Sequence, residues 1–419
     1  MRAVNRVIVI LCLLLVSAHI AVAETGAEGW LRYARIRDLI ALHRYDMLPN
    51  RIVVLGNGLV ERNAAVELQR GLQSMLARTF TVEYRTAGAP DKSIAIVLGT
   101  AAAFRHGDDR TMQQGKRLGP DAFTFITEGS GSKRRIIIAG GDERGELYGA
   151  FYLLGLVGTE RPLPHRSITE SPAAPIRWVN QWDNLNGTIE RGYAGRSIFF
   201  DKGHVRADLT RVYEYGRLLS SVGINGVTIN NVNADLRTLE PGMILEFARV
   251  ADRLRPWGVR MSLSIDLSSP MAVGHLRNFD PLDPQVIAWW QSKVDEIYRA
   301  IPDFGGFVIK ADSEGRLGPS RYGRTPAEAA NTVARALKPH GGIVLYRGFV
   351  YNNHLDWRDP KADRARAGYD NFHALDGKFD PNVVIQIKNG PIDFQVREPV
   401  SSLFAALQHT NQAIELQIT

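Results

Sequence analysis

The sequence predicts an α/β protein built from a small α/β domain and an incomplete (β/α)8 TIM barrel. Short apolar runs that end in glycine alternate with segments of helical periodicity along most of the chain. A proline-rich stretch, residues 161–175, divides this alternation into two zones and is expected to be a linker. In the second zone, polar residues follow the end of one predicted strand after another, which favours a barrel over an open doubly wound sheet.

The first zone, residues 24–160, has the pattern of a self-contained α/β domain. Its predicted strands are apolar runs, and the last two flank a Gly-Ser-Gly turn as a hairpin. The glycines that follow lack the G-x-G-x-x-G spacing of a dinucleotide-binding loop, so they predict an ordinary strand-to-helix turn. The predicted strands are Arg51–Leu55, Ser93–Leu98, Phe123–Ile126 and Arg135–Ala139, and the predicted helices are Asn63–Ala77 and Gly145–Leu156.

The second zone, residues 176–419, repeats a strand-and-helix rhythm that is typical of a barrel of parallel strands. Seven strands are predicted, and the sequence ends before an eighth. The predicted strands are Arg177–Trp182, Gly226–Asn230, Arg260–Ile265, Gly306–Ile309, Gly342–Tyr346, Val383–Ile387 and Ala413–Ile418, and the helices between them include Leu209–Val222, Ile244–Leu254, Pro284–Ala300 and Pro326–Leu337.

Residues 1–23 have the pattern of a secretory signal peptide. Two arginines precede the apolar run Val7–Val16, and the segment closes with small residues at Ala21–Ala23. The apolar run is too short for a transmembrane helix, so we expect an exported protein, periplasmic or extracellular, without a stable membrane anchor. Cleavage would remove Cys12, the only cysteine of the chain, and with it any disulfide or cysteine-ligated metal.

The charge pattern argues against nucleic acid as a partner. The formal net charge is +7, from 51 lysines and arginines against 44 acidic residues, but the basic residues are scattered along the chain. We interpret this as a mildly basic surface that favours acidic small molecules.

Charged residues at the predicted strand ends point to a chemistry. In a barrel these ends meet on one face, so their residues form one site. Carboxylates on separate strands are the equipment of glycoside hydrolysis, where one carboxyl is the acid and the other the base or nucleophile. The accompanying cations suit a substrate that carries its own carboxylate, such as a uronic acid. The residues at these ends are Trp182, Asp183, Asp266, Lys310, Asp312, Glu314, Arg347, Lys388 and Asp393.

Several of these residues have a structural alternative. Asp312 could cap the following helix, and Asp266 could be a cap or loop residue. The lysines and arginine could pair with the same carboxylates, and Trp182 could belong to the core. No histidines occur at metal-ligand spacing, and the sequence predicts neither a metal nor another cofactor.

Long sequence blocks resemble glycoside hydrolase family 67, the α-glucuronidases. The block W-D-N-L-N-G-T-I-E-R-G-Y-A-G-R-S-I at Trp182–Ile198 is similar to the family signature. Four further blocks follow in family order: D-P-L-D-P at Asp280–Pro284, I-P-D-F-G-G-F at Ile301–Phe307, K-A-D-S-E-G at Lys310–Gly315 and K-N-G-P-I-D-F-Q at Lys388–Gln395. The resemblance extends from about Glu24 to the end and includes an N-terminal domain like the one that precedes hexosaminidase-type barrels.

The resemblance implies a reaction and a role for each matching position. Members remove α-1,2-linked (4-O-methyl)glucuronic acid from the non-reducing terminal xylose of xylooligosaccharides, with inversion and without a cofactor. Glu314 matches the general acid, Asp393 matches one of two base carboxylates, and Val232 matches the position that packs on a 4-O-methyl group. The implied substrate-binding residues are Trp182, Asp183, Arg196, Val232, Lys310, Arg347 and Lys388.

The sequence departs from the family pattern at its end. Family members continue after E-L-Q-I-T with Gln-Glu-Tyr, whose glutamate is the second base carboxylate, then with an eighth strand and a helical domain that carries a dimer interface. We therefore expect this chain to be a fragment with little activity of its own, and the full-length protein to be a homodimer. A non-catalytic binder of acidic oligosaccharides, or another carboxylate-pair glycosidase of hexosaminidase-like architecture, remains an alternative.

Overall fold

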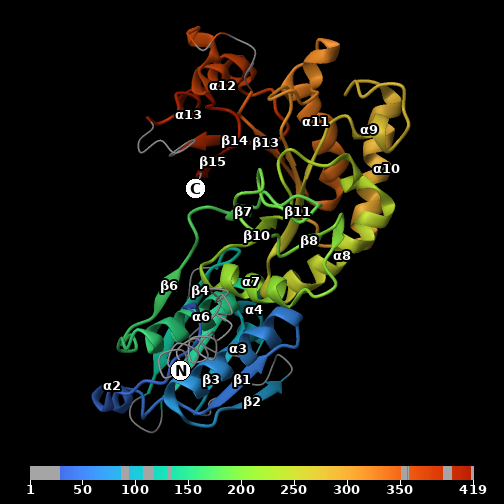
Figure 1. Cartoon of the computed structure of the whole chain (residues 1–419). Helices are drawn as coiled ribbons and strands as arrows, with labels where there is room; N and C mark the ends of the chain where they lie inside the picture. The colour runs from blue at the N-terminus through green and yellow to red at the C-terminus, as the bar shows by residue number, and fades with distance from the viewer. Residues whose placement is uncertain are drawn as a thin grey trace, which may run out of the picture.

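The computed structural model describes residues 29–85, 94–106, 118–129, 134–350, 356, 358–389 and 399–416. Two large sheets organise these residues, one in each part of the chain, and helices pack against both (Figure 1). The predicted signal peptide and Cys12 lie outside the described residues. Within the described ranges, no helix is long and apolar enough to cross a membrane.

The N-terminal sheet has the strand order β2-β1-β3-β5-β4-β6 in the described residues. Strands β1, β2, β3 and β5 run parallel, whereas β4 pairs antiparallel with both β5 and β6. The predicted hairpin is therefore confirmed, and part of the segment predicted as a linker extends this sheet as β6. The strands are β1 (Arg51–Leu55), β2 (Thr81–Arg85), β3 (Ile96–Thr100), β4 (Phe123–Glu128), β5 (Arg135–Gly140) and β6 (Ile168–Glu170).

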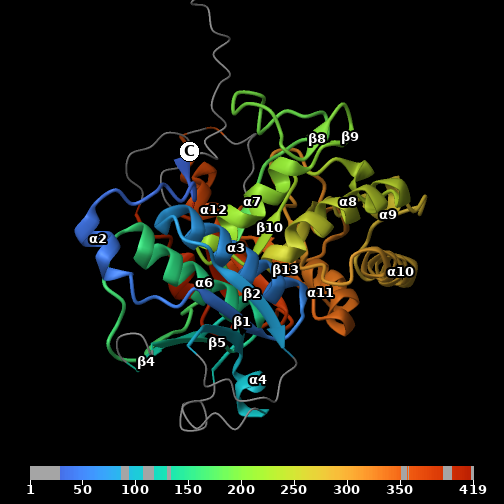
Figure 2. The same ribbon diagram turned by 90° about the horizontal axis from the view of Figure 1, so that it is seen from below.

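Helices cover both faces of this sheet, which explains the continuous apolar runs of its strands. Ile52 and Val54 of β1 face the core under the two long helices, whereas Val53 and Leu55 face the smaller cluster under α4. Helices α3 and α6 lie side by side (Figure 2). The helices are α2 (Leu39–Arg44), α3 (Leu59–Leu76), α4 (Ala101–His106) and α6 (Glu143–Gly158).

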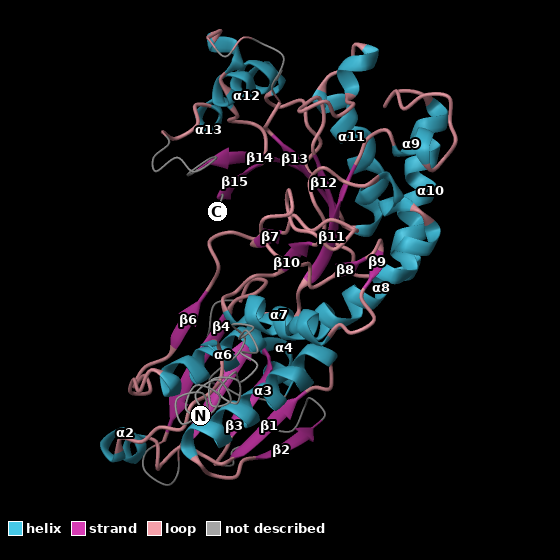
Figure 3. Ribbon diagram, in the orientation of Figure 1, coloured by secondary structure: helices cyan, strands magenta, loops and turns pink. Residues whose placement is uncertain are grey.

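The C-terminal sheet is a curled sheet of parallel strands in the order β7-β10-β11-β12-β13-β14-β15 (Figure 3). Strands β7 and β15 are its edges, so the described strands form an incomplete barrel, as predicted. The strands are β7 (Trp178–Asn180), β10 (Gly226–Thr228), β11 (Arg260–Ile265), β12 (Gly306–Ile309), β13 (Ile343–Arg347), β14 (Val383–Asn389) and β15 (Gln412–Leu416), and a short hairpin, β8 (Phe200–Asp201) with β9 (His204–Val205), follows β7.

The barrel helices pack on the outer face of the curled sheet, and this cover does not extend over β15. The outward residues Ile385 and Ile387 of β14 are buried, whereas Ile414 and Leu416 of β15 are 58% and 59% exposed. The helices are α7 (Thr210–Ser221), α8 (Pro241–Leu254), α9 (Ser269–Ala272), α10 (Pro284–Ala300), α11 (Pro326–Leu337), α12 (Arg364–Phe372) and α13 (Leu403–Ala406).

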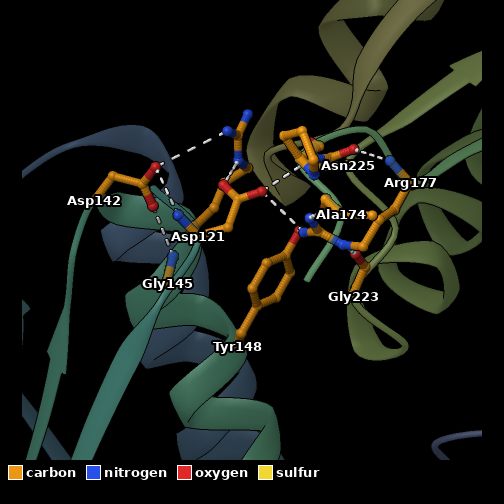
Figure 4. Close-up of polar contacts among 10 residues, drawn as sticks. Asp121, Asp142, Gly145, Tyr148, Ala174, Arg177, Gly223 and Asn225 are labelled. Atoms are coloured by element: carbon orange, nitrogen blue, oxygen red, sulfur yellow. Dashed lines mark hydrogen bonds and ion pairs between the residues drawn. The ribbon is translucent and has the colours of Figure 1, made fainter. Parts of the chain in front are cut away.

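A buried aspartate joins the two parts of the chain (Figure 4). Asp121 precedes β4 and is 4% exposed. Its carboxylate accepts hydrogen bonds from Arg144 Nε at 2.6 Å, Arg177 Nη2 at 2.8 Å and Asn225 Nδ2 at 2.8 Å. Burial alone would raise the pKa of Asp121, but Arg144 and these hydrogen bonds lower it below its usual value. This network fixes the N-terminal domain against the start of the barrel.

A pocket of about 400 Å³ lies at the same junction. Arg177 and Gly223, which line it, precede β7 and β10, so it opens at the N-terminal ends of the barrel strands. In barrel enzymes the active site lies at the opposite end of the barrel, at the C-terminal ends of the strands. Its aromatic lining residues are Phe123, Tyr148, Phe151 and Tyr152.

Each predicted strand and helix has a counterpart among the described elements, with ends that differ by a few residues. Helices α2 and α4, strands β2 and β6 and the β8–β9 hairpin were not predicted. Strand β2 pairs only with β1 among the described strands, and none of its residues is fully buried. Its sequence, T-V-E-Y-R, therefore lacks the apolar run by which buried strands were recognised.

Candidate active site

The inner face of the curled sheet has an apolar layer at mid-height. Side chains alternate between the faces of a strand, and Val308, Leu345 and Val384 of three neighbouring strands share one inner cluster. The strand register pairs Val308 with Leu345 and Leu345 with Val384. Val232, from the loop after β10, belongs to the same cluster, and Trp182 packs against it.

Charged side chains lie two to four residues beyond this layer, toward the C-terminal ends of the strands. The register pairs Arg347 with Gln386 and Lys388 with Glu415. Because these residues occupy alternate positions, they share the inner face with Val308 and its neighbours. Lys310 follows β12 in the same alternation. The predicted cations therefore meet at one end of the barrel, as the sequence indicated.

Lys310 is buried and contacts two neighbours through its ammonium group. Nζ donates to Oε2 of Glu314 and, at 2.9 Å, to Oδ1 of Asn233. Burial lowers the pKa of Lys310, and the contact with Glu314 opposes this shift. The predicted general acid thus lies directly beside one of the predicted uronate-binding cations.

The turn that carries Glu314 has a strained backbone. Asp312 and Glu314 both have positive φ angles, 50° and 52°, a region that residues other than glycine seldom adopt. The side chain of Asp312 holds this turn by accepting hydrogen bonds from the backbone and the hydroxyl of Ser320. In the described contacts Asp312 therefore has a structural role, which was one of the alternatives that the sequence left open. Strain of this kind is concentrated at functional sites.

Arg347 is 2% exposed, and its guanidinium forms a two-point ion pair. Nε donates to Oε2 of Glu415 at 2.8 Å, and Nη2 donates to Oε1 at 2.6 Å. Gln386 Nε2 also donates to Oε2 of Glu415, at 2.6 Å. The guanidinium carbon lies 5.5 Å from the ring centroid of Trp182 and 5.2 Å from that of Phe349, so the cation is held between aromatic rings.

Lys388 has a different environment. Its Nζ lies 4.7 Å from the ring centroid of Phe349. Among the described residues, no carboxylate lies within 4.0 Å of this ammonium. Burial, together with the charge of Arg347, lowers the pKa of Lys388 to about 8. A cation that is partly desolvated and lacks a carboxylate partner is suited to binding an anionic ligand.

The loop after β7 contributes Trp182 and Asp183. Asp183 is 2% exposed, and burial raises its pKa to about 6, while a hydrogen bond with Ser197 opposes this rise. Asp183 also lines a cavity of about 290 Å³ at the C-terminal ends of β7 and β10. Asn233, which binds Lys310, and Arg316 line the same cavity, so it adjoins the charged group.

The remaining candidates lie at the edge of this site or outside the described residues. Arg196 is exposed and forms a β-bridge with Thr188, and the structure records no ion pair between Arg196 and the charged group in the residues it describes. Asp266 holds its own loop through Ser268 and pairs with Arg316 at 3.1 Å. Asp393 lies outside the described residues.

Glu415 is the site residue that the sequence analysis did not identify. It lies inside the last predicted strand, two residues after Ala413, and the analysis considered only residues at strand ends. The signal that could have identified Glu415 is a charged residue at a strand position that faces the inside of the barrel. In the part of the chain that the structure describes, no group of three or more metal-ligating side chains could hold a metal ion.

Two family descriptions match the chain. Residues 29–153 match the glycosyl hydrolase family 67 N-terminus, and residues 156–419 match the glycosyl hydrolase family 67 middle domain. The chain belongs to glycoside hydrolase family 67. Family 67 membership agrees with the sequence blocks quoted above, and both matches together cover nearly all described residues of the molecule.

The curated relatives that match the chain include fungal proteins of greater length. A protein of Neosartorya fischeri named probable alpha-glucuronidase A is 48% identical over 408 residues, which are 97% of this chain and 47% of that protein. The alpha-glucuronidase of Hypocrea jecorina is 45% identical over 421 residues, 98% of this chain and 48% of that protein. The chain spans about half the length of the curated relatives it matches.

Solved structures support the fold alone. The structure of CpGH84D aligns with a TM-score of 0.52 at 10% identity, over 81% of this chain and 52% of that one.

Proposed function

We propose that the protein is an α-glucuronidase that acts on glucuronoxylan fragments. In this proposal it hydrolyses the α-1,2 bond between (4-O-methyl)glucuronic acid and the non-reducing terminal xylose of a xylooligosaccharide, with inversion. The observation that carries the proposal is the cluster of three cations and two carboxylates on the inner face of the barrel, formed by Lys310, Arg347, Lys388, Glu314 and Glu415.

The charges of this cluster account for recognition of an acidic sugar. Lys388 and Arg347 are partly desolvated cations that can bind the uronate carboxylate by charge-assisted hydrogen bonds. Trp182 provides an aromatic wall, and Val232 provides an apolar contact for a 4-O-methyl group.

Glu314 is proposed as the general acid that protonates the leaving xylose oxygen. An adjacent ammonium favours the ionised form of a carboxyl group. Proton donation therefore requires that Lys310 exchange its contact with Glu314 for a contact with the substrate's carboxylate. Binding of the uronate and release of Glu314 would then be one event, so that the acid becomes available only when the correct sugar is bound.

Asp393 is proposed as a base carboxylate for the attacking water. Inversion requires that the acid and base carboxyl groups stand about 6.5–9.5 Å apart, with the water between the base and the sugar. The family pattern supports this assignment, as it supports a second base carboxylate and a homodimer, whereas export of the protein rests on the signal-peptide pattern of residues 1–23.

The test is hydrolysis of aldotetraouronic acid, followed by proton NMR of the released uronic acid. The protein should be expressed as printed and, where the gene continues, at the length that the gene encodes. We expect release of the sugar as the inverted anomer, and a loss of about 10²–10⁴-fold in kcat for Glu314→Gln because a general acid contributes that much.

The control is Glu296→Gln on α10. Glu296 also contacts a lysine, since Lys293 Nζ donates to it at 2.6 Å, but this pair belongs to an outer helix. The kcat of Glu296→Gln should equal that of the unmodified protein. Binding of glucuronate without any turnover, by the protein at the length that the gene encodes, would contradict the proposal and favour a non-catalytic binder.

A further inference from the structure

The ion pair between Arg347 and Glu415 bridges strands that are not neighbours. Arg347 belongs to β13 and Glu415 to β15, and Gln386 of the intervening β14 donates to the same carboxylate. Glu415 thus accepts three hydrogen bonds from two residues, which fixes its position on the inner face. A two-point contact of this kind also fixes the plane of the guanidinium.

The contact leaves one side of the guanidinium available. Nε and Nη2 of Arg347 are taken by Glu415, and no acceptor for Nη1 is recorded among the described residues. Trp182 and Phe349 hold the group between their rings. Arg347 therefore cannot rotate its free edge away from the interior without losing both the ion pair and these ring contacts.

The ion pair between Arg347 and Glu415 also determines which cation of the site keeps an uncompensated charge. Glu415 cancels the charge of Arg347, and Lys388 lies directly opposite Glu415 in the strand register. Charged groups from four elements face Lys388: Arg347 on β13, Glu415 on β15, Arg364 on α12 and Glu314 in the loop after β12. Without the charge of Glu415, the two arginines would oppose protonation of Lys388.

We propose that Glu415 is a positioning residue, which fixes Arg347 with one donor edge free and cancels its charge, so that this edge and Lys388 together receive the substrate's carboxylate. The inference rests on the proposed function for the identity of the ligand as a uronate. It assigns no contact between Glu415 and the substrate. Gln386 supports the same arrangement by holding Glu415.

The test uses binding of free D-glucuronate, measured by calorimetry between pH 6 and 9.5, with the variants Glu415→Gln and Glu415→Asp. Glutamine offers one oxygen where Glu415 offers two, so it cannot form the two-point pair with Arg347, and it removes a negative charge beside Lys388. We expect Glu415→Gln to weaken binding about 10–100-fold, because a hydrogen bond to a charged group contributes about 1.5–3 kcal/mol. We also expect the alkaline loss of binding to begin at a lower pH.

Glu415→Asp separates position from charge. It keeps the negative charge but withdraws the carboxylate from Arg347 by one methylene group. Binding should weaken, while the pH at which binding is lost should stay unchanged. This variant also decides the proposal if Glu415→Gln does not fold, since binding of unmodified strength by Glu415→Asp would overturn it. In hydrolysis, both variants should raise KM more than they lower kcat.

Asp303→Asn is the matched control. Asp303 forms a similar two-point pair with Arg255, at 2.8 and 3.0 Å, but it lies before β12, at the opposite end of this strand from Lys310. It should lower stability without changing glucuronate binding. If Glu415→Gln behaves as Asp303→Asn does, with stability reduced and binding and its pH profile unchanged, Glu415 is structural and the proposal is wrong. Absence of hydrolysis by the unmodified protein at the length that the gene encodes would instead contradict the proposed function alone.

Discussion

Two aspartates, one at the domain junction and one at the candidate site, are almost equally buried but titrate in opposite directions. Asp121 is 4% exposed and has a lowered pKa, because two arginines and Asn225 compensate its charge. Asp183 is 2% exposed and has a pKa raised to about 6, because only Ser197 opposes the effect of burial. Burial alone therefore does not decide the protonation of a carboxyl group; its hydrogen-bond partners do.

The same contrast holds for the cations of the two regions. At the junction, the guanidinium of Arg177 is occupied by Asp121 and by backbone carbonyls of Ala174 and Gly223. At the site, Lys388 has an aromatic contact and no carboxylate partner among the residues described. A network in which the charged groups all have partners holds two parts of a protein together. A network that leaves a charged group without a partner can form further interactions with a ligand.

The largest expected effect is the loss of the junction network in Asp121→Asn. The ion pairs of Asp121 stabilise the folded state above the unfolded pKa near 4, and this contribution is lost as the pH falls. Removal of one partner from a buried ion pair costs about 3–5 kcal/mol. The free energy of unfolding at pH 7, from urea denaturation, should fall by this amount while glucuronate binding persists.

The matched control is Asp235→Asn. Asp235 pairs with Arg237 at 3.0 Å, but both side chains are exposed. An exposed pair contributes about 0–1 kcal/mol. A loss in Asp121→Asn no greater than in this control would show that the junction network does not hold the domains.

Asp183→Asn should have the opposite effect on stability. The folded-state pKa lies above the unfolded value, so the unfolded chain loses its proton first and stability falls as the pH rises from about 4 to 6. A net shift of two pKa units, in which the bond with Ser197 is already included, corresponds to at most about 3 kcal/mol. The variant should be about 1–2 kcal/mol more stable than the unmodified protein at pH 7 and equal to it below pH 4. Equal stability of Asp183→Asn and the unmodified protein between pH 4 and pH 7 would contradict the comparison of the two aspartates.

Glucuronate binding should depend on the protonation of Lys388. With a pKa of about 8, the ammonium is present below this pH and lost above it. The dissociation constant measured by calorimetry should rise about tenfold per pH unit above 8. Lys388→Arg should abolish this dependence because a guanidinium stays protonated. Lys293→Arg, at a lysine paired with Glu296 on α10, should keep the profile of the unmodified protein.

The smallest expected effect concerns the apolar wall of the site. Val232→Ala removes two methyl groups from the inner cluster. If Val232 packs on a 4-O-methyl group, the preference for methylated over unmethylated aldouronic acid should fall by about 3–10-fold, on the order of 1 kcal/mol. Val344→Ala, at a buried outward position of β13, should lose similar stability without changing this preference.

The sequence by itself determined the parallel strands, the incomplete barrel and the cations at one end of it. The alternation of apolar strand runs with helical segments, and the position of the charged residues at the strand ends, suffice for that, because the carboxyl ends of parallel strands must meet. The junction network was out of reach, since Asp121 and Asn225 are 104 residues apart and carry no motif.

Only the tertiary structure decided how the charges are paired. The sequence predicted Lys310, Arg347 and Lys388 as equivalent uronate ligands, but packing places a carboxylate against the first two and, among the described residues, an aromatic ring without a carboxylate against the third. Glu415 reaches Arg347 across an intervening strand because the sheet curls. The curvature of the sheet brings inward side chains of non-neighbouring strands together, and the distance between these side chains cannot be read from the sequence pattern.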